Sequence, residues 1–134
     1  MQRLDHINIR THRLEETKDF YVNILGLHVG ERPPFSFPGY WLYDERVPVI
    51  HLTGLDAADE RVERGTGPVD HVSFAASGLS ELRERIRTVA LPSTERVVPR
   101  NGSLQVFITD PNGVLFEIAF AASEVPAGES HVSR

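Results

Sequence analysis

The chain repeats itself, and this internal repeat constrains its fold more than any other feature. Residues 4–9 (LDHINI) recur 65 positions later as residues 69–74 (VDHVSF). Residues 44–52 (DERVPVIHL) correspond to residues 110–118 (DPNGVLFEI) at an offset of 66. Because both pairs occur in the same order at nearly the same offset, they indicate two copies of one structural module.

Each copy begins with a short strand of alternating pattern and continues into an amphipathic helix. Apolar side chains recur at helical spacing over residues 14–25, where Gly26 follows as a helix end, and again over residues 79–89. The sequence 110–113 (DPNG) is typical of a turn between two strands. The further strands are expected at residues 27–32, 39–44, 48–53, 95–100, 103–109 and 114–120. Each module is therefore predicted to have the order βαβββ.

The predicted fold is α+β, with tandem βαβββ modules in residues 1–53 and 69–120 that together form one domain. Residues 54–68 are polar and contain glycine, which predicts a linker. Residues 121–134 lack periodicity, and we expect a mobile tail there.

The composition excludes several classes of protein. With 14 Lys and Arg against 19 Asp and Glu, the net charge is −5, so no basic surface for nucleic acid or anionic lipid is expected. Apolar residues make up 40% of the chain, which is enough for a folded core. Residues 1–12 carry charges where a signal peptide needs an apolar stretch, and no run reaches the roughly 18 apolar residues of a membrane span. We therefore expect a cytoplasmic protein without a nucleic-acid or membrane partner.

The chain has no cysteine, so any metal must be bound by His, Asp or Glu. In a strand, alternate residues face opposite sides of the sheet. This parity places Ile7 and Ile9 on one face of the first strand, and His6, Asn8 and Arg10 on the other.

The same parity gives a polar sheet face in both modules. It carries His6 and His51 in the first module, and His71 and Glu117 in the second. Any one of these residues alone is more simply explained as a hydrogen-bonded structural residue. Four residues of metal-binding type at repeat-equivalent positions of equal parity, however, predict a metal site.

Residues near this face are candidates for contacts with a substrate. Asn8 and Arg10 share the parity of His6 and suit an anionic or oxygen-rich group, although a surface charge at a strand end explains Arg10 equally well. Residues 33–43 are rich in aromatic side chains and include Trp41. They are a candidate wall around a planar or apolar group, and packing in a sheet or dimer is the alternative.

With residues 20–27 (FYVNILGL) and 110–118, the chain resembles the vicinal oxygen chelate superfamily over about residues 3–120. This superfamily includes glyoxalase I, extradiol dioxygenases, methylmalonyl-CoA epimerase and fosfomycin-resistance transferases. The resemblance implies curved mixed sheets that enclose a divalent metal, with the helices on the outer face. The family's ligand positions match the four residues of the predicted metal site. The resemblance also implies a homodimer, and whether one or two chains complete a site stays open.

The resemblance implies a divalent-metal-dependent glyoxalase-like lyase or isomerase that acts on a small carbonyl or hydroxy-carbonyl substrate, with Glu117 as ligand and proton-transfer base. Four protein ligands on a six-coordinate ion leave two positions, which suits a substrate with neighbouring oxygens. The donors suit zinc, nickel, cobalt, manganese or iron. Typical glyoxalase I has a carboxylate at the place of His51, whereas Arg10 matches an arginine that meets the glutathione carboxylate.

Two alternative functions stay open. An Fe(II) extradiol-type dioxygenase needs three open metal positions for a catecholate and O2, so one of the four ligands, such as His51, would have to leave or lie apart. A non-catalytic drug-binding resistance protein is the second alternative. Such members of the superfamily usually lack the metal ligands, which this chain retains at His6, His51, His71 and Glu117.

Overall fold

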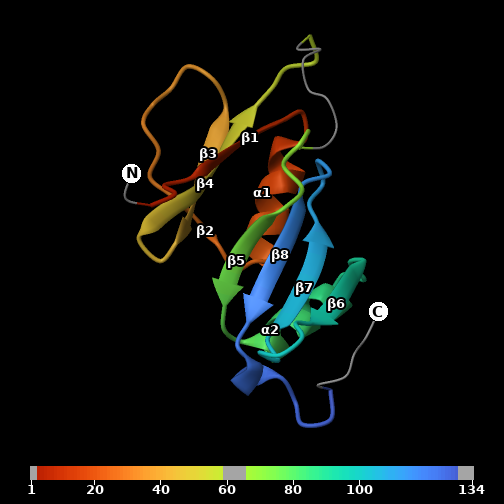
Figure 1. Ribbon diagram of the computed structural model, residues 1–134. Helices are drawn as coiled ribbons and strands as arrows, with labels where there is room; N and C mark the ends of the chain where they lie inside the picture. Colours follow the sequence, from red (N-terminus) through yellow and green to blue (C-terminus); the bar gives the residue numbers. More distant parts are fainter. Residues whose placement is uncertain (1–2, 59–65, 130–134) are drawn as a thin grey trace. The chain divides into compact units, whose positions relative to one another are not determined.

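The computed structural model describes residues 3–58 and 66–129 (Figure 1). It divides into two compact units, Met1–Arg64 and Gly65–Arg134. Of the predicted linker, residues 59–65 lie outside the described residues. Neither helix in the described ranges has the length and apolar run that crossing a bilayer requires.

The first unit is a mixed four-stranded sheet with one helix. Its elements are β1 (Ile7–Thr11), α1 (Leu14–Asn23), β2 (His28–Gly30), β3 (Gly39–Asp44) and β4 (Val47–Gly54). The strand order is β1-β4-β3-β2, and β1 runs parallel to β4 while the other pairs are antiparallel. The chain crosses over through α1, which contacts β2, β3 and β4.

The bounds of α1 follow from local hydrogen bonds. The Thr11 hydroxyl accepts a hydrogen bond of 2.8 Å from the Arg13 backbone N–H just before the helix begins. At the other end, Gly26 adopts a φ of 74°, and the Leu27 N–H reaches back to the Tyr21 carbonyl at 3.2 Å. Glycine tolerates this left-handed conformation without steric cost. The helix ends at Asn23, two residues short of the predicted range 14–25, and Gly26 lies in the turn that follows it.

The second unit repeats this topology. Its elements are β5 (Val72–Ala76), α2 (Leu79–Thr88), β6 (Ser93–Val97), β7 (Leu104–Thr109), β8 (Leu115–Phe120) and a 3₁₀ turn (Ala122–Glu124). The strand order is β5-β8-β7-β6, with β5 parallel to β8. Two tandem βαβββ modules in an α+β fold are thus confirmed.

The segment after β8 packs against the start of α2. The Glu124 carboxylate accepts hydrogen bonds from the backbone N–H groups of Gly78 at 2.6 Å and Leu79 at 3.1 Å. These groups have no partner within the helix, and a negative charge there also interacts favourably with the helix dipole. Arg83 on α2 forms an ion pair with Glu129 at 2.7 Å. Residues 121–129 of the predicted mobile tail are described, and residues 130–134 lie outside the described residues.

The turn between β7 and β8 is organised by a buried carboxylate. Asp110 is 4% exposed, and its Oδ1 accepts hydrogen bonds from the backbone N–H groups of Asn112 and Val114, both at 2.8 Å. Gly113 supplies a φ of 87°. This turn, predicted from its sequence, fixes where β8 begins, and therefore which of its residues lie on each face of the sheet.

Candidate metal centre

In the first unit, strand register places His51 between two other predicted site residues. His51 lies near the middle of β4, opposite Asn8 of β1 and opposite Trp41 of β3. Partners directly opposite each other in a sheet present their side chains on the same face. The Asn8 amide also donates a hydrogen bond of 3.2 Å to the hydroxyl of Thr53, which lies two residues beyond His51 on β4. The face predicted to be polar therefore carries Asn8, Trp41, His51 and Thr53 together.

The His51 imidazole is held between two other rings. Its centroid lies 3.7 Å from that of His6 and 4.1 Å from the Trp41 ring, with interplanar angles of 17° and 6°. His51 is 9% exposed, and its Nε2 has no hydrogen-bond partner in the described part of the chain. Burial lowers the pKa of His51, and the neighbouring His6 lowers it further, against a hydrogen bond to the Pro48 carbonyl. His51 therefore presents a neutral nitrogen with an unused lone pair.

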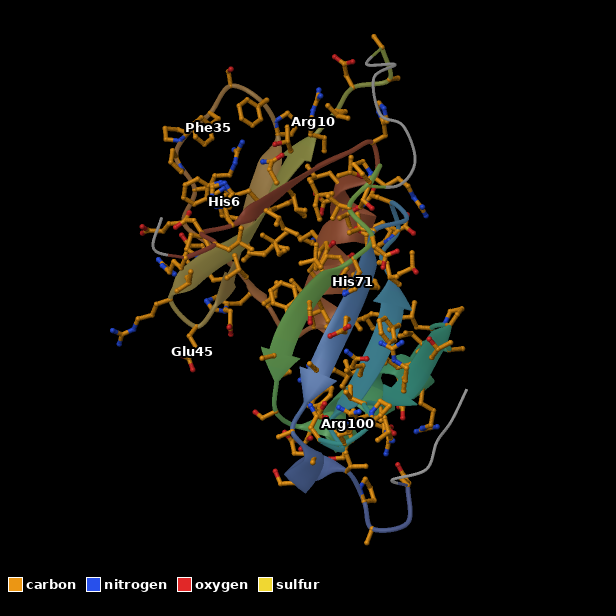
Figure 2. The ribbon with its side chains drawn as sticks, viewed as in Figure 1. His6, Arg10, Phe35, Glu45, His71 and Arg100 are labelled. Atoms are coloured by element: carbon orange, nitrogen blue, oxygen red, sulfur yellow. The ribbon has the colours of Figure 1, made fainter. Side chains whose placement is uncertain are left out.

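His6, which immediately precedes β1 (Figure 2), is oriented by the residue before it. Its Nδ1 lies 2.8 Å from the Asp5 carboxylate. A carboxylate only accepts hydrogen bonds, so Nδ1 carries the proton and Nε2 has the free lone pair. This hydrogen bond lowers the pKa of Asp5. Histidines that bind metals are commonly oriented in this way by a carboxylate on the other ring nitrogen.

In the second unit, the centre of the polar face is the Glu117 carboxylate on β8. Glu117 is 7% exposed and lies opposite Ser73 of β5 and Phe107 of β7. The Ser73 hydroxyl donates a hydrogen bond of 2.8 Å to Oε1. On the other oxygen, Oε2 lies 3.4 Å from Nε2 of His71. The Ser73 hydroxyl therefore orients one carboxylate oxygen of Glu117, and the other oxygen faces the His71 imidazole.

The His71 ring has the same local arrangement as His6. Its Nδ1 lies 2.7 Å from the Asp70 carboxylate, and its edge packs against Phe107 at a centroid distance of 6.2 Å. With the proton on Nδ1, the Nε2 lone pair and the Glu117 carboxylate face each other, an arrangement that a shared cation stabilises. Adjacent ligands about 2.1 Å from one metal ion lie roughly 3.0–3.4 Å apart, which the Nε2–Oε2 distance of 3.4 Å matches.

The structure therefore brings the predicted ligands together in pairs, His6 with His51 in the first unit and His71 with Glu117 in the second. Within residues 3–58 and 66–129, no group of three or more His, Asp or Glu side chains converges on one point. Three imidazole nitrogens and one carboxylate are donors that suit a divalent transition metal, and the unpartnered Nε2 of His51 fits the same use. Arg10, exposed and opposite Thr53, lies two residues along β1 from Asn8.

Sequence reasoning missed the groups that orient these ligands. Asp5 and Asp70 each precede a predicted ligand, and the repeated Asp-His dipeptide was the signal that could have identified them. Ser73 has the parity of the polar face but was not recognised as a partner of Glu117. Phe107 carries no such signal, because its contact with His71 depends on the register between β7 and β8.

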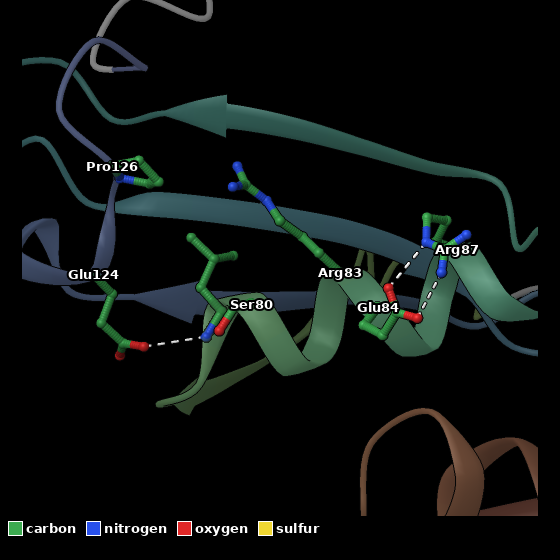
Figure 3. Close-up of a pocket in the computed structure, with 7 residues that line it drawn as sticks. Ser80, Arg83, Glu84, Arg87, Glu124 and Pro126 are labelled. Atoms are coloured by element: carbon green, nitrogen blue, oxygen red, sulfur yellow. Dashed lines mark hydrogen bonds and ion pairs between the residues drawn. The ribbon is translucent and has the colours of Figure 1, made fainter.

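A groove of about 340 Å³ lies elsewhere, beside α2 (Figure 3). It is lined by Leu79, Ser80, Arg83, Glu84, Arg87, Glu124 and Pro126, none of which is a predicted site residue. Its charged groups are already paired, Arg87 with Glu84 on the same helix and Arg83 with Glu95 at 2.7 Å. We therefore assign this groove to the packing around α2 and not to the metal centre.

Comparison with known proteins agrees with this architecture. Residues 3–118 match the family described as the glyoxalase/bleomycin resistance protein/dioxygenase superfamily. The lactoylglutathione lyase of Escherichia coli O157:H7 is 31% identical over 125 residues, which cover 87% of this chain and 90% of the relative. Glyoxylase I 4 of Arabidopsis thaliana is 24% identical over 119 residues, which cover 86% of this chain and 68% of the relative.

Solved structures share the fold at lower identity. The lactoylglutathione lyase of Agrobacterium tumefaciens superposes with a TM-score of 0.64 at 20% identity and covers 92% of this chain and 96% of its own. A fosfomycin resistance protein of Listeria monocytogenes gives a TM-score of 0.67 at 18% identity, with 98% and 99% covered. The repeat, the two sheets and the match over nearly the whole chain lead to one conclusion: this chain belongs to the glyoxalase/bleomycin resistance protein/dioxygenase superfamily.

Proposed function

We propose that this protein is a divalent-metal-dependent, glyoxalase-like lyase or isomerase that acts on a small carbonyl or hydroxy-carbonyl compound. The observation that carries the proposal is the Glu117 carboxylate, which is nearly buried, with Ser73 on one oxygen and the His71 imidazole 3.4 Å from the other. Burying a carboxylate is costly unless a hydrogen bond or cation compensates it. The 31% identity to proteins named lactoylglutathione lyase supports the same class of reaction.

The proposed ligands are His6, His51, His71 and Glu117, with zinc, nickel, cobalt, manganese or iron as the ion. A bound divalent ion would supply a Lewis acid that polarises the substrate carbonyl and acidifies the neighbouring C–H bond. The carboxylates of Asp5 and Asp70 accept hydrogen bonds from Nδ1 of His6 and His71, so that the Nε2 lone pair of each ring is available to bind the metal.

Glu117 is the proposed base that moves the proton. In an α-hydroxy carbonyl compound, its carboxylate removes the proton from the hydroxyl-bearing carbon and returns it to the former carbonyl carbon, while the hydroxyl proton passes to the former carbonyl oxygen. The Ser73 hydroxyl orients the carboxylate through its bond to Oε1. Asn8 and Arg10, on the face of His51, are proposed to bind an oxygen-rich or anionic part of the substrate. A homodimer is proposed as the assembly.

The metal content of the purified protein tests this proposal before any substrate is known. The protein is purified without an affinity tag, and metals are measured by mass spectrometry in the wild type, His6→Ala and Glu117→Ala. We expect close to one equivalent of a transition metal per site in the wild type and a loss in both variants. His28→Ala is the matched control, because the exposed His28 stacks on Tyr43 and is not a proposed ligand. A wild type that is metal-free and cannot be reconstituted would refute the proposal and favour a non-catalytic binding protein.

A further inference from the structure

The only tryptophan of the chain lies flat against a proposed metal ligand. Trp41 and His51 are directly opposite on β3 and β4, and their rings are 6° from parallel at a centroid distance of 4.1 Å. His6 covers the other side of the His51 ring at 3.7 Å. The imidazole is therefore the middle layer of three stacked rings.

We propose that Trp41 is a positioning residue that clamps the His51 imidazole against His6, so that Nε2 is held in one orientation for metal binding. This inference rests on the proposed function, since it assumes that His51 is a ligand. It changes the expected role of Trp41 from a contact with the substrate to a contact with the ligand itself.

The clamp works through steric restriction. Turning the His51 ring about its Cβ–Cγ bond would drive its edges into the ring planes on both sides, which lie within about 4 Å. A 180° ring flip, which exchanges the places of Nδ1 and Cδ2 and of Nε2 and Cε1, requires the same opening. Because the buried Nε2 has no hydrogen-bond partner in the described residues, no hydrogen bond there fixes the ring, and the two flanking rings hold it in its orientation.

Trp41 is itself supported from the loop between β2 and β3. Phe35 lies 6.4 Å from the Trp41 ring and stacks on Phe37 at 5.2 Å. The Arg32 guanidinium lies 4.9 Å from the centroids of both phenylalanine rings and donates a hydrogen bond of 3.0 Å to the Phe37 carbonyl. This aromatic group limits the freedom of the indole, as a positioning role requires.

Cobalt binding tests the role in the whole protein. Co2+ is titrated calorimetrically into metal-free wild type, Trp41→Phe, Trp41→Leu and the control Tyr43→Leu, which removes an aromatic ring of β3 that stacks on His28 and not on His51. Phenylalanine retains a flat face and leucine does not, so we expect Trp41→Leu to bind about 10-fold more weakly and Trp41→Phe to stay within about 3-fold of the wild type. Tyr43→Leu should match the wild type, and thermal unfolding verifies that each variant is folded.

A second readout tests the stack without metal. Proton NMR of the metal-free protein should show the His51 ring protons shifted upfield by the Trp41 ring current, and Trp41→Leu should remove that shift. An unshifted His51 in the wild type would overturn the inference. Cobalt binding by Trp41→Leu at the wild-type affinity would overturn it as well. If that variant binds cobalt normally but has a raised KM for its substrate, Trp41 is a substrate contact and not a positioning residue. A wild type with the shift but without cobalt binding refutes the proposed function itself, and the positioning role with it.

Discussion

At the scale of single residues, Glu117 has the most demanding environment of the proposed ligands. It is 7% exposed, yet a serine hydroxyl and an imidazole approach its two oxygens. Hydrogen bonds of this kind offset the cost of burying a carboxylate. A substitution that removes the charge of Glu117 but keeps its shape therefore separates the chemical role of the side chain from its structural role.

The first prediction concerns Glu117→Gln. The amide is isosteric and can still accept the Ser73 hydrogen bond, so we expect a folded protein with an unfolding midpoint close to that of the wild type. Because an amide does not accept the substrate proton, turnover should fall below detection. The measurement is exchange of the α-proton of 2-oxoaldehyde thiol adducts and 2-hydroxy ketones in deuterated water, followed by NMR. Glu45→Gln, at an exposed turn, is the control. If Glu117→Gln exchanges the α-proton at the wild-type rate, Glu117 is not the base.

The second prediction concerns the carboxylates beside His6 and His71. Asp5→Asn and Asp70→Asn retain an oxygen that can accept from Nδ1 but remove the charge that fixes the tautomer. We expect each change to weaken Co2+ binding about 10-fold, the lower end of the range for groups that orient ligands. Calorimetric titration measures this, with Asp44→Asn at the exposed end of β3 as control. Unchanged affinity in both variants would show that the two carboxylates are solvent-exposed charges without a role in the site.

At the scale of elements, the turn between β7 and β8 is predicted to carry a large share of the local stability. Asp110→Ala removes the acceptor for two backbone N–H groups and for the Asn112 side-chain amide at 3.1 Å. Since the carboxylate is buried, we expect a loss of roughly 2–4 kcal/mol in the free energy of unfolding. Urea unfolding of wild type and variant measures it. Asp56→Ala, which removes a single exposed bond to the Ala58 N–H, should change little, and equal effects of the two changes would contradict the prediction.

The elements were predictable because each depends on local pattern. The repeat and the helical spacing gave the order of strands and helices, and Gly26 and residues 110–113 marked two of the turns between them. The strand predicted at residues 95–100 instead spans Ser93–Val97, because Arg100 and Gly102 adopt φ values of 74° and 71° in the turn that follows. A left-handed arginine has no signal in the sequence, since its conformation is imposed by the surrounding turn.

The site was less predictable than the fold, because it depends on register. Parity assigns a residue to a face, and it assigned His51 to the polar face, whereas Trp41 was singled out only as part of the aromatic-rich residues 33–43. Which residues of β3 and β4 lie opposite each other is decided by the turn at residues 45–46 and by a shift in register between Leu42 and Tyr43. No periodicity encodes that shift. The stack on His51 therefore became visible only in the structure.

At the scale of the whole molecule, the repeat distributes the proposed ligands evenly, two in each unit. A ligand that binds the native state but not the unfolded chain stabilises the native state by mass action, by about 2.7 kcal/mol at a concentration 100 times its Kd. For a chain of 134 residues this corresponds to a rise in the unfolding midpoint of very roughly 5–10 °C. Saturating Co2+ should therefore raise the midpoint, and removal of the metal by a chelator should lower it again.

The variants make this a test of both units. Because the proposal takes two of its four ligands from each unit, it predicts that His6→Ala in the first and Glu117→Ala in the second each abolish most of the cobalt-dependent rise, while His28→Ala retains it. Differential scanning calorimetry with and without Co2+ measures all four proteins. If only the variant of one unit loses the rise, the ion is bound by that unit alone, and the four-ligand assignment is wrong. If none loses it, cobalt binds at other groups, and the proposed metal centre fails as a whole.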